Sequence, residues 1–527
     1  MDLGTLFTLL MFASLFGLLM LGFPVAFTLA GTGVIFGIIG MFTGTLDATF
    51  LEFFPNRIFD NIIRNELLFA VPLFVMMGIT LEKSKVAEDL LESMGQLFGN
   101  LRGGLGISVT LVGALLAAST GIVGATVVTM GLLSLPTMLR RGYDPSLATG
   151  IIAASGTLGQ IIPPSIVLIL LADVMSSAWQ QAQLSNGVFS PIPMSAGELF
   201  AGALIPGLIL VGLYICYQIA VAIFQPQRCP AIEKSADQHL DQNFYKKLLM
   251  ALIPPLALII SVLGSILSGV ATPTEAASVG AIGALLLGAI RMDSINAKYF
   301  LITIVALLLL LFIANIADLR MDLSVVQLSD KIAYGFAVVL TLIFTAGLLL
   351  ALYKKWQSGV LEEILTSTVR MSTMIYAILI GASLFSLVFR GYGGDEAIEH
   401  LLTNIPGGQA GALIAVMLVM FFLGFFLDFI EITFVVVPIV APALLAMDGT
   451  LGPIWLGVMM AMNLQTSFLT PPFGFALFYL RGVAPESVKT SAMYKGVLPF
   501  ILIQIIGLLL LVLFPELTTW LPSKLFG

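Results

Sequence analysis

The chain has 527 residues, of which 59% are hydrophobic and only 10% are charged. Its mean hydropathy is +1.06, whereas an ordinary soluble domain has about 25% charged residues. This composition excludes a globular protein with a single membrane anchor. It predicts a polytopic chain that the lipid bilayer surrounds, with no nucleic acid as a partner.

The N-terminal segment predicts a retained first span. The chain turns apolar directly after its start, without the basic region of a secretory signal, so we interpret residues 3–22 as a membrane helix. Cys216 lies in an apolar helix and Cys229 in a loop, which favours packing over a disulfide. His239 and His400 lie in polar loops. This placement argues against a metal centre and against histidine-based catalysis.

Apolar runs of about 20 residues recur along the chain, as membrane-spanning helices require. They predict full spans near 3–22, 24–42, 67–82, 147–174, 199–224, 248–270, 273–291, 299–318, 332–353, 364–390, 453–480 and 497–514.

Two further apolar segments, 103–140 and 409–452, are about 40 residues long and polar at the middle. Each is too long for one span, so we predict a re-entrant hairpin of two half-helices that meet inside the membrane. The first is flanked by basic residues, namely Lys83, Lys85, Arg102, Arg140 and Arg141. The second is flanked by acidic residues, namely Asp395, Glu396, Glu399 and Asp448. Because cytoplasmic loops are enriched in Lys and Arg, the two hairpins should enter from opposite faces.

A double proline follows each hairpin at the same distance. Pro163 lies 43 residues after Thr120, and Pro471 lies 43 residues after Asp428, so the two halves repeat with an offset of 308 residues. Proline interrupts a helix, and a matched pair of interrupted apolar segments marks the binding site of an inverted-repeat transporter. We therefore predict an all-α polytopic inverted-repeat protein with two re-entrant hairpins and two broken helices. Its predicted parts are a first repeat at 1–228 with hairpin 103–140, a cytoplasmic loop at 229–247, a second repeat at 248–527 with hairpin 409–452, and an inserted pair of extra transmembrane helices within 292–360.

Oxygen-bearing residues at the first hairpin tip and the first break suggest a sodium site. The residues are Ser119, Thr120 and Gly121 at the tip, and Gly159 and Pro163 at the break. Na⁺ prefers hydroxyl and carbonyl oxygens over nitrogen or sulfur. The alternative is that the hydroxyls only bond back to helix carbonyls. The symmetric site would use Thr466, Ser467 and Thr470 with the second tip.

Three charged residues lie in apolar surroundings. Asp428 sits at the second tip and Glu431 three residues later. An acidic side chain near the bilayer centre costs about 2.5–3.5 kcal/mol on insertion scales, which makes it a functional candidate. Arg390 ends an apolar run, and its guanidinium suits a bidentate carboxylate clamp. The alternative for Arg390 is contact with lipid headgroups.

Several segments together resemble the large membrane (M) subunit of tripartite ATP-independent periplasmic (TRAP) transporters. They are NELLFAVPLFVMMG (65–78), the hairpin at 113–131, GYDPSLATGIIAASGTLGQIIPPSI (142–166), ATPTEAASVGA (271–281) and LTPPFGFALFYLRG (469–482). The resemblance covers nearly the whole chain apart from about 292–360 and the loop 175–198. At the first tip the chain departs from the family's pattern, because Ile122 and Val123 stand where two hydroxyls are common.

The resemblance implies an elevator-type importer of the bacterial inner membrane, in which Na⁺ drives uptake of an organic acid. It implies two partners, a periplasmic solute-binding protein and a small (Q-type) membrane subunit, and no cofactor besides Na⁺ as coupling ion. It carries Ser165, Arg390 and Asp428 over as substrate-site residues, and the residues of the tips and breaks as sodium ligands.

Two other functions stay open at the level of the sequence. A stand-alone sodium–carboxylate symporter would share the architecture without needing a binding protein. An intramembrane enzyme could use Asp428 and Glu431, but no His, Cys or second Asp in another span supports it. The sequence leaves open the identity of the solute, the number of sodium ions and the role of the extra helices.

Overall fold

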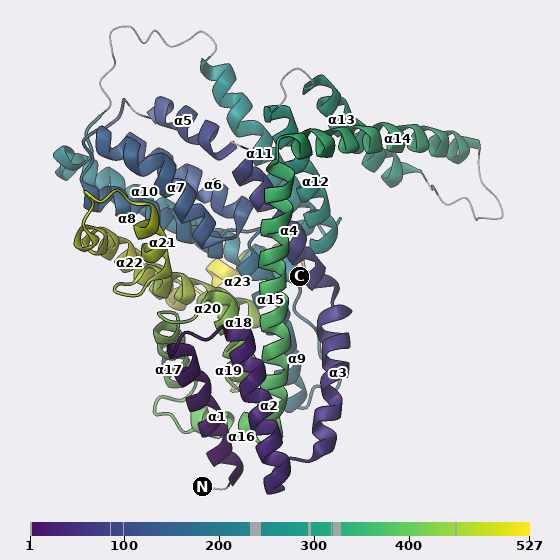
Figure 1. Cartoon of the computed structure of the whole chain (residues 1–527), viewed down its shortest axis with the longest axis vertical. Helices are drawn as coiled ribbons and strands as arrows, with labels where there is room; N and C mark the ends of the chain where they lie inside the picture. Colours follow the sequence, from purple (N-terminus) through teal and green to yellow (C-terminus); the bar gives the residue numbers. More distant parts are fainter. Residues whose placement is uncertain are drawn as a thin grey trace.

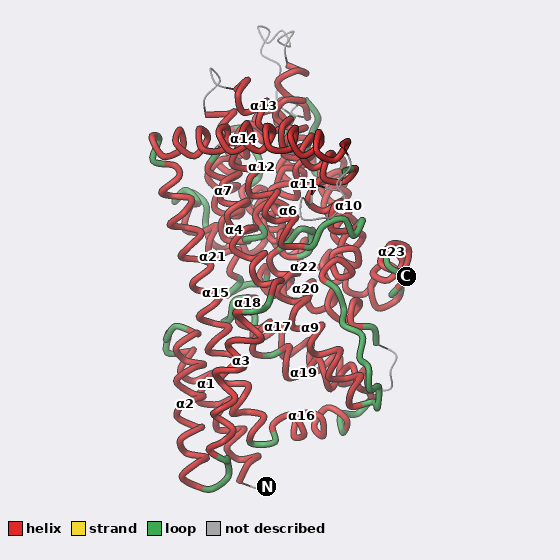
Figure 2. Tube along the Cα trace, turned by 90° about the vertical axis from the view of Figure 1, so that its right-hand side faces the viewer, coloured by secondary structure: helices red, strands yellow, loops and turns green. Residues whose placement is uncertain are grey.

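The computed structural model describes residues 3–84, 86–98, 100–231, 244–292, 297–317, 319, 328–447 and 451–527. Within these ranges the chain forms helices joined by short loops and contains no strand (Figures 1 and 2). Ten of the described helices are long and apolar enough to cross a membrane, or up to thirteen if each bent pair is one span. The predicted all-α polytopic fold is confirmed.

The long helices lie where the apolar runs predicted them, within a few residues at most ends. They are α1 (Leu3–Met20), α2 (Val25–Thr43), α4 (Glu66–Lys83), α10 (Ala196–Phe224), α11 (Phe244–Leu267), α12 (Pro273–Met292), α13 (Ala297–Ile316), α14 (Leu328–Gln357), α15 (Val360–Gly391) and α22 (Thr490–Leu513).

The first hairpin consists of α6 (Gly104–Thr120) and α7 (Val123–Arg140). Gly121 ends α6 in the left-handed conformation, at φ 60°, which a glycine adopts without steric cost. The first broken helix follows as α8 (Pro145–Thr157), a 3-10 turn η3 (Leu158–Gln160) and α9 (Ile166–Ser185). The regular α-helix is therefore interrupted at 158–165, around the first double proline, as the sequence predicted.

The second hairpin consists of α17 (Gly408–Leu423), α18 (Phe429–Val435) and α19 (Val437–Ala446), with a bend of 54° between the last two. The second broken helix is α20 (Pro453–Leu469) and α21 (Phe475–Val483). Here the break is shorter than the first one, because α20 stays helical as far as Leu469 and α21 starts at Phe475. Each double proline contains a cis peptide bond.

Short elements connect these parts, and the sequence reasoning did not predict them. They are η1 (Ala48–Glu52), α3 (Phe53–Ile58), the π-helical turn η2 (Phe59–Ile63), α5 (Val86–Phe98), η4 (Pro226–Arg228), α16 (Gly394–Thr403) and α23 (Glu516–Leu525). Among them, α5 leads from the end of α4 to the first hairpin.

The helices pack in two groups (Figure 1). In the first, which we call the long-helix group, α2 packs along α15 and α4 packs between α12 and α15, with α1 and α11 beside them. In the second, the hairpin group, α8 packs against α7 and α22, and α19 packs against α9. The hairpin group therefore contains both hairpins and both broken helices.

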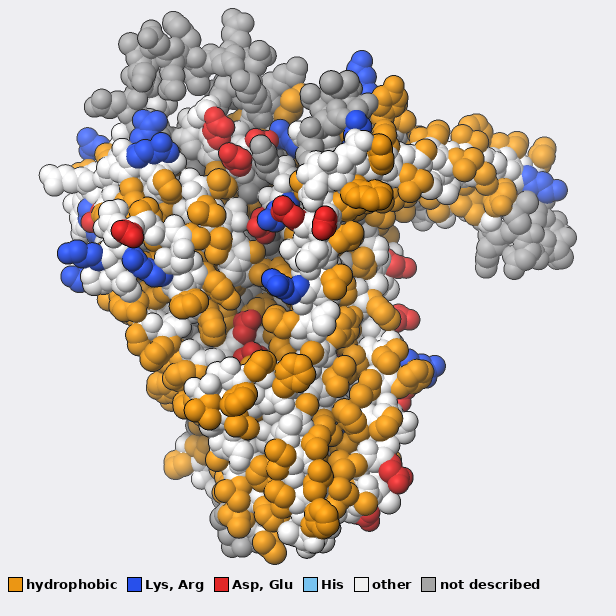
Figure 3. All heavy atoms as spheres, in the orientation of Figure 1, with side chains coloured by type: hydrophobic (Ala, Val, Ile, Leu, Met, Phe, Trp, Pro, Cys, Tyr) orange, Lys and Arg blue, Asp and Glu red, His pale blue; other side chains and the backbone are white. Residues whose placement is uncertain are grey.

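Charged side chains are unevenly distributed over the surface. Figure 3 shows Lys and Arg gathered around the end of the molecule that holds α5, the end of α7 and the start of α8, while the opposite end is largely hydrophobic on this face. This distribution agrees with the loop charges, which assign the α5 end to the cytoplasm.

Candidate functional site

The first hairpin tip lies directly against the first break. A Cβ atom added to Gly121 would lie 2.9 Å from the backbone nitrogen of Ile166, the first residue of α9. One added to Gly159 would lie 3.5 Å from the Cα atom of Ala117 in α6. The structure thus brings together the predicted residues Gly121 and Gly159, whereas the side chains of Ser119 and Thr120 lie outside the described part of the chain. At Gly121 only glycine combines the left-handed backbone with so close an approach.

Ser165 lies at the N-terminal end of α9 and is completely buried. Its hydroxyl donates to the Gln160 carbonyl oxygen at 3.2 Å and does not cap the helix. The first amides of α9 are therefore not used by this side chain. Because a helix N-terminus carries partial positive charge, this end of α9 favours an anionic group.

The second hairpin approaches the second break in the same way. A Cβ atom added to Gly424, just after α17, would collide with the Ser467 hydroxyl. Ser467 and Thr466 are buried, and their hydroxyls donate to the Leu464 and Met462 carbonyls at 2.8 and 2.9 Å. The Thr470 hydroxyl donates to the Thr466 carbonyl at 2.8 Å. These hydroxyls donate their protons to the helix, but their oxygen lone pairs remain able to accept or coordinate.

Asp428 and Glu431 form a capping box at the start of α18. The Asp428 carboxylate accepts from the Phe429 amide at 2.6 Å, and the Glu431 carboxylate accepts from the Asp428 amide at 2.9 Å. Within the described part of the chain, no Lys or Arg forms an ion pair with either carboxylate. The motif Asp-x-x-Glu before an apolar run signals such a box, and the sequence reasoning missed it.

Tyr479 of α21 connects the two hairpins and was also missed. A Cβ atom added to Gly124 of α7 would lie 3.0 Å from the Tyr479 ring. The Tyr479 phenol is also within electrostatic reach of both Asp428 and Glu431. A polar side chain of the second broken helix therefore lies between the first hairpin and the carboxylates of the second.

The two broken helices also meet through buried polar side chains. Gln465 of α20 donates to the Thr157 hydroxyl of α8 at 3.4 Å, and the two residues are 308 positions apart, as are the double prolines. Gln504 of α22 donates to the Tyr214 hydroxyl of α10 at 2.8 Å. All four side chains are buried. Buried polar groups are costly unless hydrogen-bonded, and the bond between Gln465 and Thr157 joins the two broken helices directly.

Arg390 lies at the far end of α15, and its contacts are with residues other than the tips. Its Nε atom is 3.2 Å from an Asp395 carboxylate oxygen, and its guanidinium donates to the Gln181 side chain of α9 at 3.1 Å. Arg57 lies within electrostatic reach of both members of this ion pair. Beside it, a hollow of about 250 Å³ is lined by Phe50, Phe53, Asn56, Arg57, Asp60, Asn61 and Leu387.

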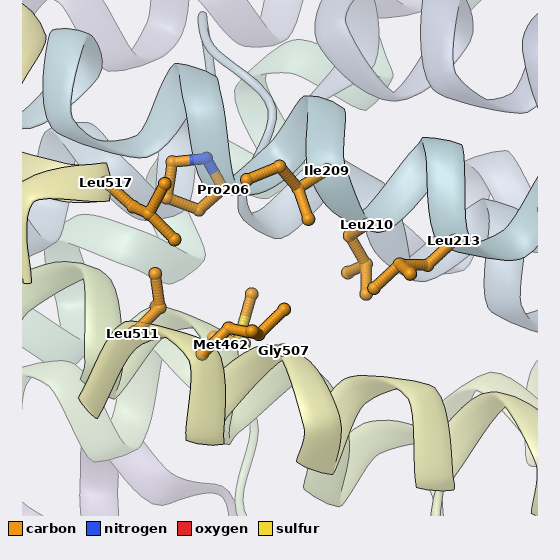
Figure 4. A pocket seen from close by; sticks show the side chains of 9 residues that line it. Pro206, Ile209, Leu210, Leu213, Met462, Gly507, Leu511 and Leu517 are labelled. Atoms are coloured by element: carbon orange, nitrogen blue, oxygen red, sulfur yellow. The ribbon is translucent and has the colours of Figure 1, made fainter. Parts of the chain in front are cut away.

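A separate cavity between α10 and α22 is unsuitable for a solute. Figure 4 shows Pro206, Ile209, Leu210 and Leu213 facing Met462, Gly507 and Leu511 across it, with Leu517 beside Pro206. Its volume is about 10 Å³, which is close to the space of one water molecule, and its lining is apolar. Among the described residues, no three His, Cys, Asp or Glu side chains cluster as a metal centre would need. A cation at the tips would have to use hydroxyl and carbonyl oxygens.

Long apolar helices, two hairpins and two broken helices define a multi-pass membrane protein of transporter type. The sequence matches the family described as "Tripartite ATP-independent periplasmic transporter, DctM component" over residues 12–333 and 296–517. The chain therefore belongs to this family, which comprises transporters of the inner membrane and not enzymes.

Individual relatives agree with this assignment. The chain is 27% identical over 523 residues to the C4-dicarboxylate TRAP transporter large permease of Vibrio cholerae, covering 98% of both chains. It is 24% identical to the sialic acid large permease of the same organism, covering 97% of both chains. It is 25% identical to the ectoine large permease of Halomonas elongata, covering 98% of this chain and 100% of the relative. A crystal structure of the YdaH transporter of Alcanivorax borkumensis has a similar fold, with a TM-score of 0.54 at 14% identity over 91% of this chain and 90% of the other.

Proposed function

We propose that this chain is the permease subunit of a sodium-coupled importer for an organic acid. The observation that carries the proposal is the close approach of a hairpin tip to a helix end beside a break, twice in one chain: Gly121 meets Ile166 at the start of α9, and Gly424 meets Ser467 in the last turn of α20. Each meeting combines backbone carbonyls, hydroxyls and helix termini in protein-lined surroundings. Those groups suit a small cation and the carboxylate of a solute.

The first sodium site would use the backbone at 119–121 and 159–163, and the second would use Thr466, Ser467 and Thr470. The solute would lie between the two hairpins, near Ser165, Tyr479 and Asp428. Because the site already holds two carboxylates, a solute anion would bind there only with cations present. This charge balance supports coupling to a cation, for which we propose Na⁺.

Arg390 belongs to the outer part of the proposed path. Its pairing with Asp395 and its bond to Gln181 are both exchangeable for a solute carboxylate. Arg57 lines the outer hollow and lies near Arg390, so an arriving organic acid would meet one guanidinium group in the hollow and a second one beside it.

The two helix groups supply a mechanism of movement. The hairpin group would shift across the membrane against the long-helix group and carry solute and Na⁺ together. Two side-chain hydrogen bonds join the groups at α9, from Asn65 to Asp173 at 2.7 Å and from Arg390 to Gln181 at 3.1 Å. Few polar contacts across an otherwise apolar surface suit a boundary that has to slide.

The relatives' names support a carboxylate solute and two partner proteins. C4-dicarboxylates, sialic acid and ectoine all carry a carboxylate group. A tripartite system implies a periplasmic solute-binding protein and a small membrane subunit beside this large one.

Uptake into proteoliposomes tests the proposal. The chain is reconstituted with the small subunit, and radiolabelled carboxylates are offered with or without an inward Na⁺ gradient and with or without the binding protein. We expect uptake only when both are present. Uptake that needs Na⁺ but no binding protein would favour a stand-alone symporter, and uptake indifferent to Na⁺ would contradict the coupling.

A further inference from the structure

The helix pair α13–α14 forms a compact unit with one point of close attachment. Gly347 of α14 packs so tightly that an added Cβ atom would collide with the Thr303 hydroxyl of α13. A small separate core joins the pair to α12 and consists of Leu286, Ala289, Phe300 and Ala351. Figure 1 shows α14 running across the direction of α15, with its C-terminal end at the body of the protein.

Lys355, in the last turn of α14, is completely buried. Its ammonium donates to the Ser84 hydroxyl at 3.3 Å, across 271 residues of sequence. No carboxylate forms an ion pair with it in the part of the chain that the structure describes. Burying an ammonium without a counter-charge is costly, so its surroundings have to compensate.

The compensation comes from the end of α4. Ser84 is the C-terminal cap residue of α4, is itself buried, and its hydroxyl donates to the Thr80 carbonyl. The last carbonyls of a helix carry partial negative charge, which attracts a cation. Gly288 of α12 makes room, because an added Cβ atom there would collide with both the Ser84 hydroxyl and the Lys355 ammonium.

The end of α4 is the place where the two helix groups are connected through α5. On its other sides this junction is held by Lys83 with Glu363 of α15 at 3.2 Å, and by Arg291 of α12 with Asp89 of α5 at 3.0 Å. Arg291 also donates to the Met250 carbonyl of α11 at 2.6 Å. In turn, α5 packs on α6, the first arm of the first hairpin. Any movement of that hairpin relative to α4 has to be absorbed near this junction.

We propose that the inserted pair α13–α14 acts as a brace for the α4–α5 junction, with Lys355 as the positioning residue that fixes it through Ser84. The proposal rests on the proposed movement of the hairpin group and explains why the pair is attached where it is. A firm junction converts displacement of the hairpin into a defined rotation of α5. A loosened junction would let α5 move without the hairpin.

Two independent substitutions disturb the brace, and each has a matched control on α14. Lys355→Met removes the ammonium but keeps an apolar stem of similar length, whereas Lys331→Met removes an exposed lysine from the same helix. Gly288→Ala introduces the collision, whereas Gly335→Ala adds the same methyl group where nothing lies within 4 Å. If Lys355→Met, which removes the donor, and Gly288→Ala, which adds a steric collision, have the same effect, the cause is the altered junction and not the loss of the lysine charge.

Uptake and hydrogen exchange are measured on each variant in the complete transporter, per amount of folded protein. We expect both brace variants to lower the maximal uptake rate by about threefold or more with an unchanged KM for solute and for Na⁺. We also expect faster amide exchange in 86–98, and neither effect in the controls. Unchanged rate and exchange, or a lowered thermal midpoint alone, would overturn the brace. If the wild type showed no Na⁺-driven uptake, the proposed function would fail, while the exchange measurement would still decide whether the junction is braced.

Discussion

The two hairpins share one arrangement but differ in how the second half-helix begins. In the first, α7 starts after Gly121 and Ile122, and no side chain caps it. In the second, α18 starts at Asp428, whose carboxylate and that of Glu431 form a reciprocal cap. Four amides at a helix start lack partners within the helix, so the first tip leaves them available and the second uses some of them.

The two tips therefore occupy equivalent positions in the repeat but carry different charge. The first tip and the bare start of α9 present helix N-termini without carboxylates, which favours an anionic group. The second tip brings two carboxylates to the same depth, which favours cations or protons. Only the second half therefore adds negative charge that bound cations have to balance, whereas the first half offers the solute carboxylate an uncapped helix start.

The largest expected effect comes from removing the carboxylate that distinguishes the second tip. Asp428→Ala should abolish uptake because it deletes both the charge and the cap of α18, while membrane insertion and expression stay near normal. The loss of uptake is measured in proteoliposomes, and insertion and expression are measured as the amount of protein in membranes.

Asparagine separates the two roles of this residue, because Asn caps a helix about as well as Asp but carries no charge. If charge matters, Asp428→Asn should be as inactive as the alanine variant but more stable to heat. Wild-type uptake in Asp428→Asn would reduce Asp428 to a cap and remove it from the proposed site.

The next largest effect is expected at the first tip, where the close backbone contact of a glycine is changed instead of a charge. Gly121→Ala should lower uptake strongly, because a left-handed alanine costs about 1–2 kcal/mol and its methyl group would press on the Ile166 backbone, 2.9 Å away. Gly187→Ala is the matched control, since Gly187 also has a positive φ, of 81°, but nothing within 4 Å. Equal loss in both variants would mean that backbone strain alone, and not the tip contact, decides the outcome.

A smaller effect is expected at the contact between the hairpins. Tyr479→Phe keeps the ring against Gly124 but removes the hydroxyl near the carboxylates, so we expect a severalfold increase in KM for the solute or for Na⁺ with little change in thermal stability. Tyr334→Phe on the exposed side of α14 serves as the control. If KM for the solute and KM for Na⁺ were both unchanged, Tyr479 would have only a packing role and its hydroxyl would not contribute to binding.

The sequence predicted the spans, the tips and the breaks because apolar length, proline and glycine act locally. It did not predict α5 or α16, since short amphipathic helices leave no membrane-length apolar run. The capping box could have been predicted, because Asp428 and Glu431 have the required spacing. Acidic residues in an apolar segment also indicate a functional charge, and that interpretation does not require a cap. Tyr479 and Lys355 could not be found from sequence, because their importance lies in contacts with Gly124 and Ser84, which are hundreds of residues away.

The smallest expected effect concerns the starts of the two broken helices, which also differ in capping, but in the opposite sense to the hairpins. Asp144 caps α8 and pairs with Arg228 at 2.9 Å, whereas α20 begins at Gly452 without a side-chain cap. Burial raises the pKa of the Asp144 carboxyl, but hydrogen bonds from Ser146, the Leu147 amide and Arg228 outweigh it and hold the pKa below its usual value of 3.8. Asp144→Ala should therefore cost about 1 kcal/mol of stability, seen as a lower thermal midpoint with uptake per folded protein unchanged.

The pH dependence of that midpoint identifies the cause. A carboxyl with a lowered pKa stabilises the fold above its unfolded value and loses this contribution as pH falls through the folded value. The difference between wild type and Asp144→Ala should hence be constant near neutral pH and shrink below about pH 4. Asp144→Asn retains a capping oxygen but not the charge for Arg228, so it should lie between the two and show no such shrinkage relative to the alanine variant. A difference between wild type and alanine that stays constant through this range would mean that the cap acts without its charge, and the two broken helices would then differ in hydrogen bonding alone.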